Sequence, residues 1–148
     1  MHNKMERILI CKLKFYGDVL LITPVITSLQ NRYPDAKIDL LLYKETKSIL
    51  AADNRIKTFY LIEKKKGLLA TIKNYLSIRR QLKKNHYDQI INLTEQWPIG
   101  ALIASLNRPS VAFEREKKLW NCLFTQVAPA AGSHIVEQNL SILKGIGF

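Results

Sequence analysis

The chain has 148 residues, 47% of them hydrophobic and 24% charged, which suits a single folded domain and excludes a disordered or fibrous protein. Its 23 lysines and arginines outnumber 12 aspartates and glutamates, and the net charge of +11 favours an anionic partner such as nucleic acid, anionic lipid or a phosphorylated sugar. No apolar run approaches the roughly 20 residues that are needed to cross a bilayer.

Strand-like and helix-like segments alternate along the chain. Runs rich in branched apolar residues predict five strands, at 7–13, 37–43, 57–63, 88–93 and 109–114. Helical spacing of apolar residues predicts helices at 18–33, 46–52, 68–85, 99–106 and 135–145. The first helix has two readings, because Thr23-Pro24 is also typical of a helix start. It is either one helix kinked at Pro24, or a short turn followed by a helix that begins near Thr23.

Nearly continuous apolar strands are typical of a parallel sheet that is covered by helices on both faces. The sequence therefore predicts an α/β sandwich. Ligands of such sheets bind outside the carboxyl ends of the strands. Residues 14–18, after the first strand, and 94–97, after the fourth, are thus expected to line one rim.

The common nucleotide, metal and hydrolase motifs are missing from the sequence. The loop KLKFYGD contains a single glycine, so it is neither a GxGxxG fingerprint nor a P-loop. The histidines are scattered, without carboxylates or thiols at ligand spacing, and there is no Gly-x-Ser-x-Gly elbow. We expect no metal and no bound cofactor.

Several segments together resemble a known enzyme family. They are K-x-x-x-x-G-D-V-L at 12–20, T-P-V at 23–25, NRYPDAKIDLLLY at 31–43, YDQIINLTEQW at 87–97 and HIVEQNLSIL at 134–143. In this order they resemble the N-terminal half of the ADP-heptose:lipopolysaccharide heptosyltransferases of glycosyltransferase family 9, above all the heptosyltransferase III branch. The resemblance runs from Arg7 to the last residue. It implies a GT-B architecture, in which two Rossmann-like domains face each other across a cleft, and inverting transfer of heptose without a metal.

The resemblance also bears on domain organisation, because such enzymes are about twice as long. It implies that residues 1–148 form the N-terminal acceptor-binding, Rossmann-like domain and that the C-terminal nucleotide-sugar domain is absent. The donor ADP-heptose would bind through that missing domain, so this chain alone is expected to have no turnover. The face left uncovered would favour a homodimer.

The resemblance assigns the central chemical role to Asp18. This residue matches the catalytic aspartate of the family, the base that takes the proton from the attacking hydroxyl. Gly17 would permit a tight turn and a close approach of backbone to ligand, and a base must come within about 3 Å of its proton. The alternative is that Asp18 caps the following helix, and the resemblance favours catalysis.

Residues beside this turn are expected to bind the acceptor. Lys12 and Lys14 could neutralise acceptor phosphates, although Lys12 could instead end a strand and point to solvent, and Lys14 could be a plain surface residue. Tyr16 could shape the acceptor pocket or pack beneath the loop.

Two further loops complete the expected acceptor site. The family uses basic residues near the position of Lys64, Lys65 and Lys66 to hold the acceptor, and a solvated surface is the alternative. Thr94, Gln96 and Trp97 offer polar and aromatic contacts to a sugar, and a core position is the alternative for Trp97.

The expected partners follow from charge and resemblance. The lipopolysaccharide inner core is densely anionic and lies at a membrane, so we expect it as the acceptor, with peripheral contact to the anionic inner membrane. The first residues, MHNKMER, lack the apolar stretch of a signal peptide, so we expect the cytoplasmic side. The alternative function is a stand-alone basic binding module for an anionic partner such as nucleic acid. No base-reading motif is present, so we expect no specific nucleic acid.

Overall fold

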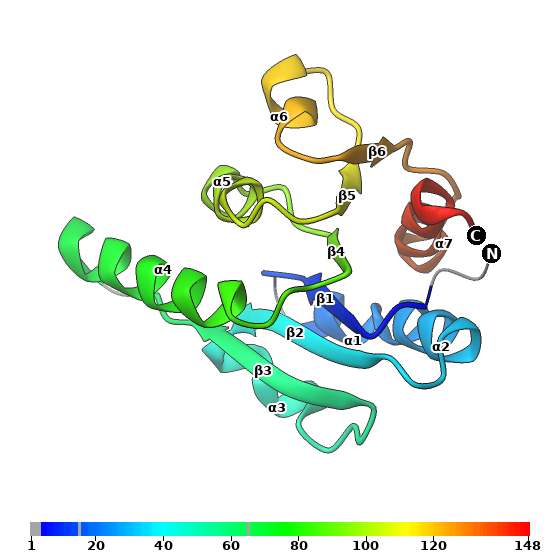
Figure 1. The fold of residues 1–148 in the computed structure, drawn as a ribbon, viewed down its shortest axis with the longest axis horizontal. Coiled ribbons are helices and arrows are strands. Elements are labelled where there is room, and N and C mark those ends of the chain that lie inside the picture. The colour runs from blue at the N-terminus through cyan, green and yellow to red at the C-terminus, as the bar shows by residue number, and fades with distance from the viewer. Residues whose placement is uncertain (1–3, 15, 65) are drawn as a thin grey trace.

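The computed structural model describes residues 4–14, 16–64 and 66–148. Six strands form one parallel sheet with the order β3-β2-β1-β4-β5-β6 (Figure 1). The strands are β1 (Arg7–Cys11), β2 (Lys37–Tyr43), β3 (Ile56–Ile62), β4 (Gln89–Asn92), β5 (Ser110–Phe113) and β6 (Gln126–Ala128). This order is that of a doubly wound Rossmann sheet, so the predicted fold class is confirmed.

Helices cover both faces of the sheet. They are α1 (Tyr16–Leu20), α2 (Thr23–Arg32), α3 (Lys47–Leu50), α4 (Leu68–Lys83), α5 (Trp97–Ser105), α6 (Lys118–Cys122) and α7 (Ile135–Ser141), with short 3-10 helices η1 (Lys44–Thr46) and η2 (Ile142–Ile146). None of the helices in the described part of the chain has the length and hydrophobicity of a membrane span.

The central strand β1 shows why the sheet is buried on both faces. Ile8 and Ile10 pack in one core with α1, α2, α3 and η2, whereas Leu9 and Cys11 pack in the other with α4, α5 and α6. All four side chains are fully buried. Because neighbouring residues of a strand point to opposite faces, an unbroken apolar run such as ILIC at 8–11 fits only a strand that is covered on both sides.

The structure refines the predicted elements. Residues 18–33 form two helices, so the kinked single helix is wrong and a second helix does begin at Thr23. Strand β6 and helix α6 were not predicted from the sequence. Strand β6 has three residues and pairs on one side alone, which is too short a segment to give a periodic pattern. The last predicted helix begins as α7 and continues as η2 to Ile146.

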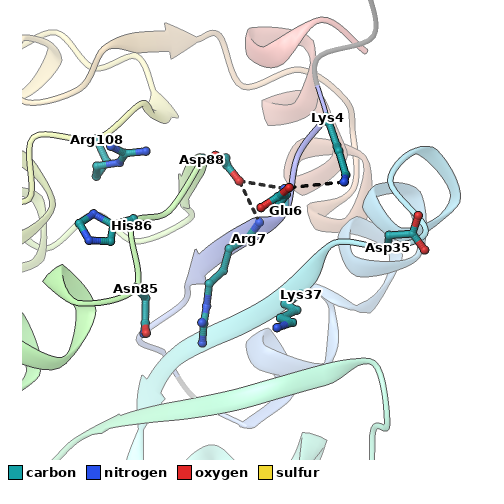
Figure 2. A pocket seen from close by; sticks show the side chains of 9 residues that line it. All are labelled: Lys4, Glu6, Arg7, Asp35, Lys37, Asn85, His86, Asp88 and Arg108. Atoms are coloured by element: carbon teal, nitrogen blue, oxygen red, sulfur yellow. Dashed lines mark hydrogen bonds and ion pairs between the residues drawn. The ribbon is translucent and has the colours of Figure 1, made fainter.

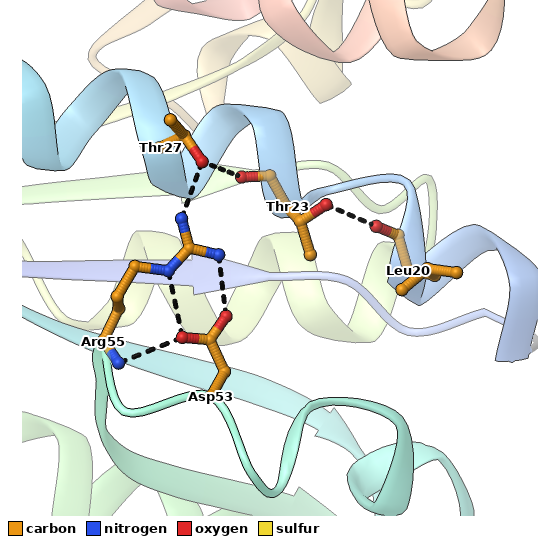
Figure 3. A network of polar contacts seen from close by, with 5 residues as sticks. All are labelled: Leu20, Thr23, Thr27, Asp53 and Arg55. Carbon is orange, nitrogen blue, oxygen red and sulfur yellow. Dashed lines mark hydrogen bonds and ion pairs between the residues drawn. The ribbon is translucent and has the colours of Figure 1, made fainter.

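The junction of α1 and α2 is fixed by a chain of polar contacts (Figure 3). The hydroxyl of Thr23 donates to Leu20 O at 3.0 Å, and the hydroxyl of Thr27 donates to Thr23 O at 3.1 Å. Arg55, just before β3, donates to Thr27 Oγ1 at 2.6 Å and binds both carboxylate oxygens of Asp53. Hydrogen bonds from Arg55 lower the pKa of Asp53. This network ties α2 to the segment before β3 and so supports α1.

A buried carboxylate links three segments near the amino ends of the strands. Asp39 on β2 is fully buried, and its Oδ2 accepts from Arg7 Nε at 3.0 Å and from the Tyr87 hydroxyl at 2.6 Å. Asn85 Nδ2 donates to the Tyr87 hydroxyl at 3.2 Å. Burial and the neighbouring Asp39 carboxylate raise the pKa of Tyr87, so it stays a neutral donor.

We expect Tyr87→Phe to lower the free energy of unfolding by about 1–3 kcal/mol, because the buried Asp39 Oδ2 loses one of its two donors. Tyr33→Phe is the matched control, since the Tyr33 hydroxyl has no hydrogen-bond partner among the described residues, and it should change stability by less than about 0.5 kcal/mol. Urea denaturation of both variants measures the difference. Equal losses would contradict a stabilising role for the Asp39–Tyr87 contact.

Candidate functional site

The candidate site lies where the segments after β1, β2, β3 and β4 converge. A pocket of about 330 Å³ is lined by Leu13, Lys14, Asp18, Tyr43, Lys64 and Gln96. We call it the Asp18 pocket. It occupies the rim that the sequence predicted, outside the carboxyl ends of the strands, where doubly wound folds bind ligands.

Asp18 is the third residue of α1, and its side chain is partly exposed to the pocket. Among the described residues, neither a backbone amide nor a side chain donates a hydrogen bond to its carboxylate. Its negative charge acts on Lys12, where it opposes the lowering of that pKa. A half-exposed carboxylate with open acceptor positions, beside ammonium groups, can bind and deprotonate a hydroxyl.

The predicted tight turn at Gly17 is wrong. Gly17 lies inside α1, and it is not one of the glycines with positive φ. A Cβ at this position would have no neighbouring atom within 4 Å, leaving out the adjacent residues and the helix backbone. The backbone therefore does not require glycine here. The free space beside it would instead let a ligand approach the backbone closely, which agrees with the second part of the expectation.

Gln96 holds the pocket together. Its Nε2 donates to Leu13 O at 3.0 Å, and its amide contacts the Tyr43 hydroxyl at 2.8 and 3.0 Å. Lys64 Nζ lies 4.6 Å from the centroid of the Tyr43 ring, a cation–π contact. Gln96 was predicted as a sugar contact, but its amide nitrogen is committed to Leu13 and Tyr43. The structure adds Tyr43 to the pocket, and its only sequence signal was its place at the end of a predicted strand.

Lys12 is buried, so the alternative that it points to solvent is wrong. Lys12 is 3% exposed, and its Nζ donates a hydrogen bond to Leu93 O at 3.2 Å. Burial is the main cause that lowers the pKa of Lys12, and Lys14 adds to it, whereas Asp18 and Glu95 oppose it. Burial of the charged ammonium group therefore costs folding free energy. An anion bound next to it would offset part of that cost.

Lys12 lines a second, smaller cavity of about 150 Å³, next to the Asp18 pocket and sharing Lys14 with it. Thr94 also lines it, is buried, and its hydroxyl has no partner among the described residues. Arg115, which the sequence did not single out, lines the same cavity and donates to Glu95 O at 3.0 Å. Glu95 and Glu114 line this cavity as well, so the charged residues around it are of both signs.

The other predicted residues lie apart from these cavities or outside the description. Trp97 begins α5, is 38% exposed and packs edge-to-face on Trp120 at 5.4 Å, so it is not a buried core residue and lines neither cavity. Lys66 is exposed and does not line the Asp18 pocket. Lys65 and the side chain of Tyr16 lie outside the described residues.

A larger pocket of about 560 Å³ lies at the opposite edge, near the amino ends of β1, β2 and β4 (Figure 2). Asp88 Oδ2 there accepts from the backbone amides of Glu6 at 2.8 Å and Arg7 at 3.0 Å. Lys4 pairs with Glu6 at 3.5 Å. These contacts bring the start of β1 to the start of β4, which is a structural task. Within the described residues no group of three or more metal-ligating side chains occurs at either edge.

Comparison with known sequences shows a strong similarity. The chain is 43% identical over 140 residues to lipopolysaccharide heptosyltransferase 3 of Escherichia coli strain K12, and the match covers 91% of this chain. A second Escherichia coli heptosyltransferase 3 is 41% identical over the same length. The chain spans 41% of the length of these two relatives. No protein-family model matches the chain.

Solved structures support the same fold. A glycosyl transferase family 9 protein from Veillonella parvula superposes with a TM-score of 0.85 at 19% identity, covering 99% of this chain and 42% of that one. Escherichia coli heptosyltransferase WaaC with ADP gives 0.80 at 20% identity, over 96% of this chain and 48% of that one. ADP-heptose lps heptosyltransferase II of Escherichia coli gives 0.73 at 15% identity, over 93% and 40%. These likenesses confirm the Rossmann-like α/β fold of the domain.

Lys12→Met tests the burial of the ammonium group. In the wild type, the unfolded chain keeps the Lys12 proton up to a pKa near 10.5, whereas the folded chain releases it at lower pH. Stability from this group therefore rises with pH between the lowered value and 10.5. We expect the unfolding free energy of the wild type, minus that of Lys12→Met, to increase over this range in urea denaturation. Exposed Lys117→Met is the matched control, and a constant difference for Lys12→Met would contradict the burial argument.

Proposed function

We propose that this chain, a homologue of the lipopolysaccharide heptosyltransferases over 91% of its length, is the acceptor-side domain of an enzyme that transfers heptose from ADP-heptose to the lipopolysaccharide inner core. The observation that carries the proposal is the partly exposed Asp18 carboxylate, which shares a pocket with Lys14 and Lys64. The donor would bind mainly in a second domain, in the part of the relatives that this chain does not span. We therefore expect the isolated chain to bind acceptor without turning it over.

In the proposed reaction Asp18 is the general base. A hydroxyl oxygen of the acceptor attacks the anomeric carbon of ADP-heptose while its proton passes to the Asp18 carboxylate. The new carbon–oxygen bond forms on the face opposite to the bond that breaks, ADP leaves with the electron pair of the broken bond, and the configuration inverts. One carboxylate is enough for this chemistry, and the family resemblance implies that no metal is required.

Charge around Asp18 supports an anionic acceptor. Lys14 and Lys64 are exposed residues that line the pocket, and among the described residues no acid other than Asp18 lines it. Ammonium groups bind phosphate and carboxylate oxygens through charge-assisted hydrogen bonds. The open side of Gly17 leaves room for a sugar beside the base.

The role of Asp18 can be tested in a chimera. This chain would replace the 140 matched residues of Escherichia coli heptosyltransferase 3, and transfer from ADP-heptose would be measured on inner-core lipopolysaccharide that lacks the added heptose. We expect Asp18→Asn to lower kcat at least about a hundredfold, because the amide cannot accept the proton. Acceptor affinity should change little, since the side chain keeps its size.

Asp35→Asn is the matched control, because Asp35 is an exposed carboxylate at the opposite edge of the sheet. It should leave kcat unchanged. Turnover by Asp18→Asn that equals the control would remove Asp18 from the mechanism. An inactive chimera with wild-type Asp18 would count against the transfer reaction itself.

Acceptor binding can be measured on the isolated chain. We expect Lys64→Gln to weaken binding of a phosphorylated inner-core oligosaccharide about tenfold, because one charge-assisted hydrogen bond is lost. Lys57→Gln, which removes an exposed lysine on β3 away from the pocket, is the control for net charge. Titration calorimetry reports both constants. Equal effects of the two substitutions would show attraction by net charge alone and would contradict a built acceptor site.

A further inference from the structure

We propose that α4 docks the protein on an anionic lipid bilayer through its exposed face. We define this α4 face by four apolar residues and four cations: Leu68, Leu69, Ile72, Leu76, Lys73, Arg80, Lys83 and Lys84. The docking surface itself does not depend on the proposed function, although its consequence for the acceptor does.

The apolar part of the face is unusually exposed. Leu68 is 76% exposed, Leu69 75% and Leu76 55%, and Ile72 between them is 44% exposed. Residues four apart lie on the same side of a helix, so these side chains form one stripe along its first two and a half turns. The helix contacts the core through other residues, chiefly Ile78 and Leu82. Exposed apolar clusters of this kind mark a surface that binds a partner.

The charge on the helix indicates which partner fits. Not one acidic residue occurs in Leu68–Lys83. The stripe ends at Leu76 beside a groove of about 330 Å³ that is otherwise lined by arginines and lysines: Arg79, Arg80, Lys83 and Lys84. Arg79 is held by Ser105, to which its Nε donates at 2.9 Å, so the other three cations are the ones available to a ligand.

A bilayer satisfies both parts of the face at once. Leucine side chains gain free energy when they enter the boundary between headgroups and acyl chains, and cations beside them bind lipid phosphates. A second copy of this chain fits poorly, because two acid-free α4 faces on molecules of net charge +11 repel each other. An anionic membrane surface is therefore the occupant that complements the face.

The position of the helix suits this role. In Figure 1, α4 extends beyond the rest of the ribbon, so a flat surface can reach it. The helix begins at Leu68, a few residues after Lys64, which lines the Asp18 pocket. A bilayer on the α4 face would hold a lipid-anchored acceptor close to that pocket, if the chain acts on one.

The apolar part is tested by vesicle binding of the 148-residue chain. Vesicles of phosphatidylcholine containing phosphatidylglycerol are compared with vesicles of phosphatidylcholine alone, by co-sedimentation. We expect binding to the first kind, and a loss of about tenfold or more in Leu68→Ser/Leu69→Ser, since two leucines no longer enter the boundary region. Leu119→Ser is the matched control, because Leu119 on α6 is also 75% exposed. It should bind like the wild type.

The charged part has its own pair of variants. Lys83→Gln/Lys84→Gln should weaken binding about tenfold, whereas Lys117→Gln/Lys118→Gln, which removes the same charge near α6, should have a much smaller effect. Circular dichroism confirms that each variant is folded. Asp18→Asn should bind the vesicles like the wild type, so failure of the proposed function and failure of this inference are distinguishable.

Three outcomes would overturn the inference. One is equal binding to vesicles with and without phosphatidylglycerol. Another is an equal loss in the α4 variants and their α6 controls, which would show attraction by net charge alone. The third is that the wild-type chain does not bind vesicles and is a dimer, whereas the Leu68→Ser/Leu69→Ser variant is a monomer. That result would make a second copy the occupant of the face.

Discussion

The side-chain amide of Gln96 joins three segments that the chain sequence keeps far apart. It donates to Leu13 O, in the segment after β1, and contacts the hydroxyl of Tyr43, the last residue of β2, while Gln96 itself follows β4. These contacts hold the walls of the Asp18 pocket at a fixed separation. The general base proposed above would need this rigidity, because an error of about 1 Å in its position costs much of its effect. In this structure the hydrogen bonds of the amide fix the geometry of the pocket, and its predicted contact with a sugar stays a prediction.

The second determinant of the site is the balance of charge around β1. Lys12 is buried, and its ammonium group donates a hydrogen bond to Leu93 O, whereas Lys14 is exposed on the surface. Burial and Lys14 both lower the pKa of Lys12, so the group costs folding free energy. The negative charges of Asp18 and Glu95 act in the opposite direction and offset part of this cost. An arriving phosphate or carboxylate would recover more, which couples acceptor binding to the stability of the rim.

The sequence predicted the fold well where local pattern decides it. Strands β1 and β2 consist mainly of apolar residues, and both faces of each strand are buried. Such runs are stable in a sheet that is covered by helices on both sides. It failed at Gly17, because the residues around it are compatible with both a turn and a short helix, and only packing of α1 on the core selects the helix. It also missed β6, which exists because β5 offers it a pairing edge. Likewise, the burial of Lys12 could not be predicted, since its partner Leu93 is 81 residues away, and Asp18 was found by motif rather than by physics.

The order of the strands has a consequence for biosynthesis. β1 lies at the centre of the sheet and pairs with β4, so Ile8 meets Gln89, and the bond between Gln96 and Leu13 spans 83 residues. Until that length of polypeptide has left the ribosome, one edge of β1 has no partner strand, and the Asp18 pocket lacks Gln96, one of its lining residues. The Asp18 pocket therefore cannot form before residue 96 has been made, and until then the apolar strand β1 is exposed to aggregation along its unpaired edge.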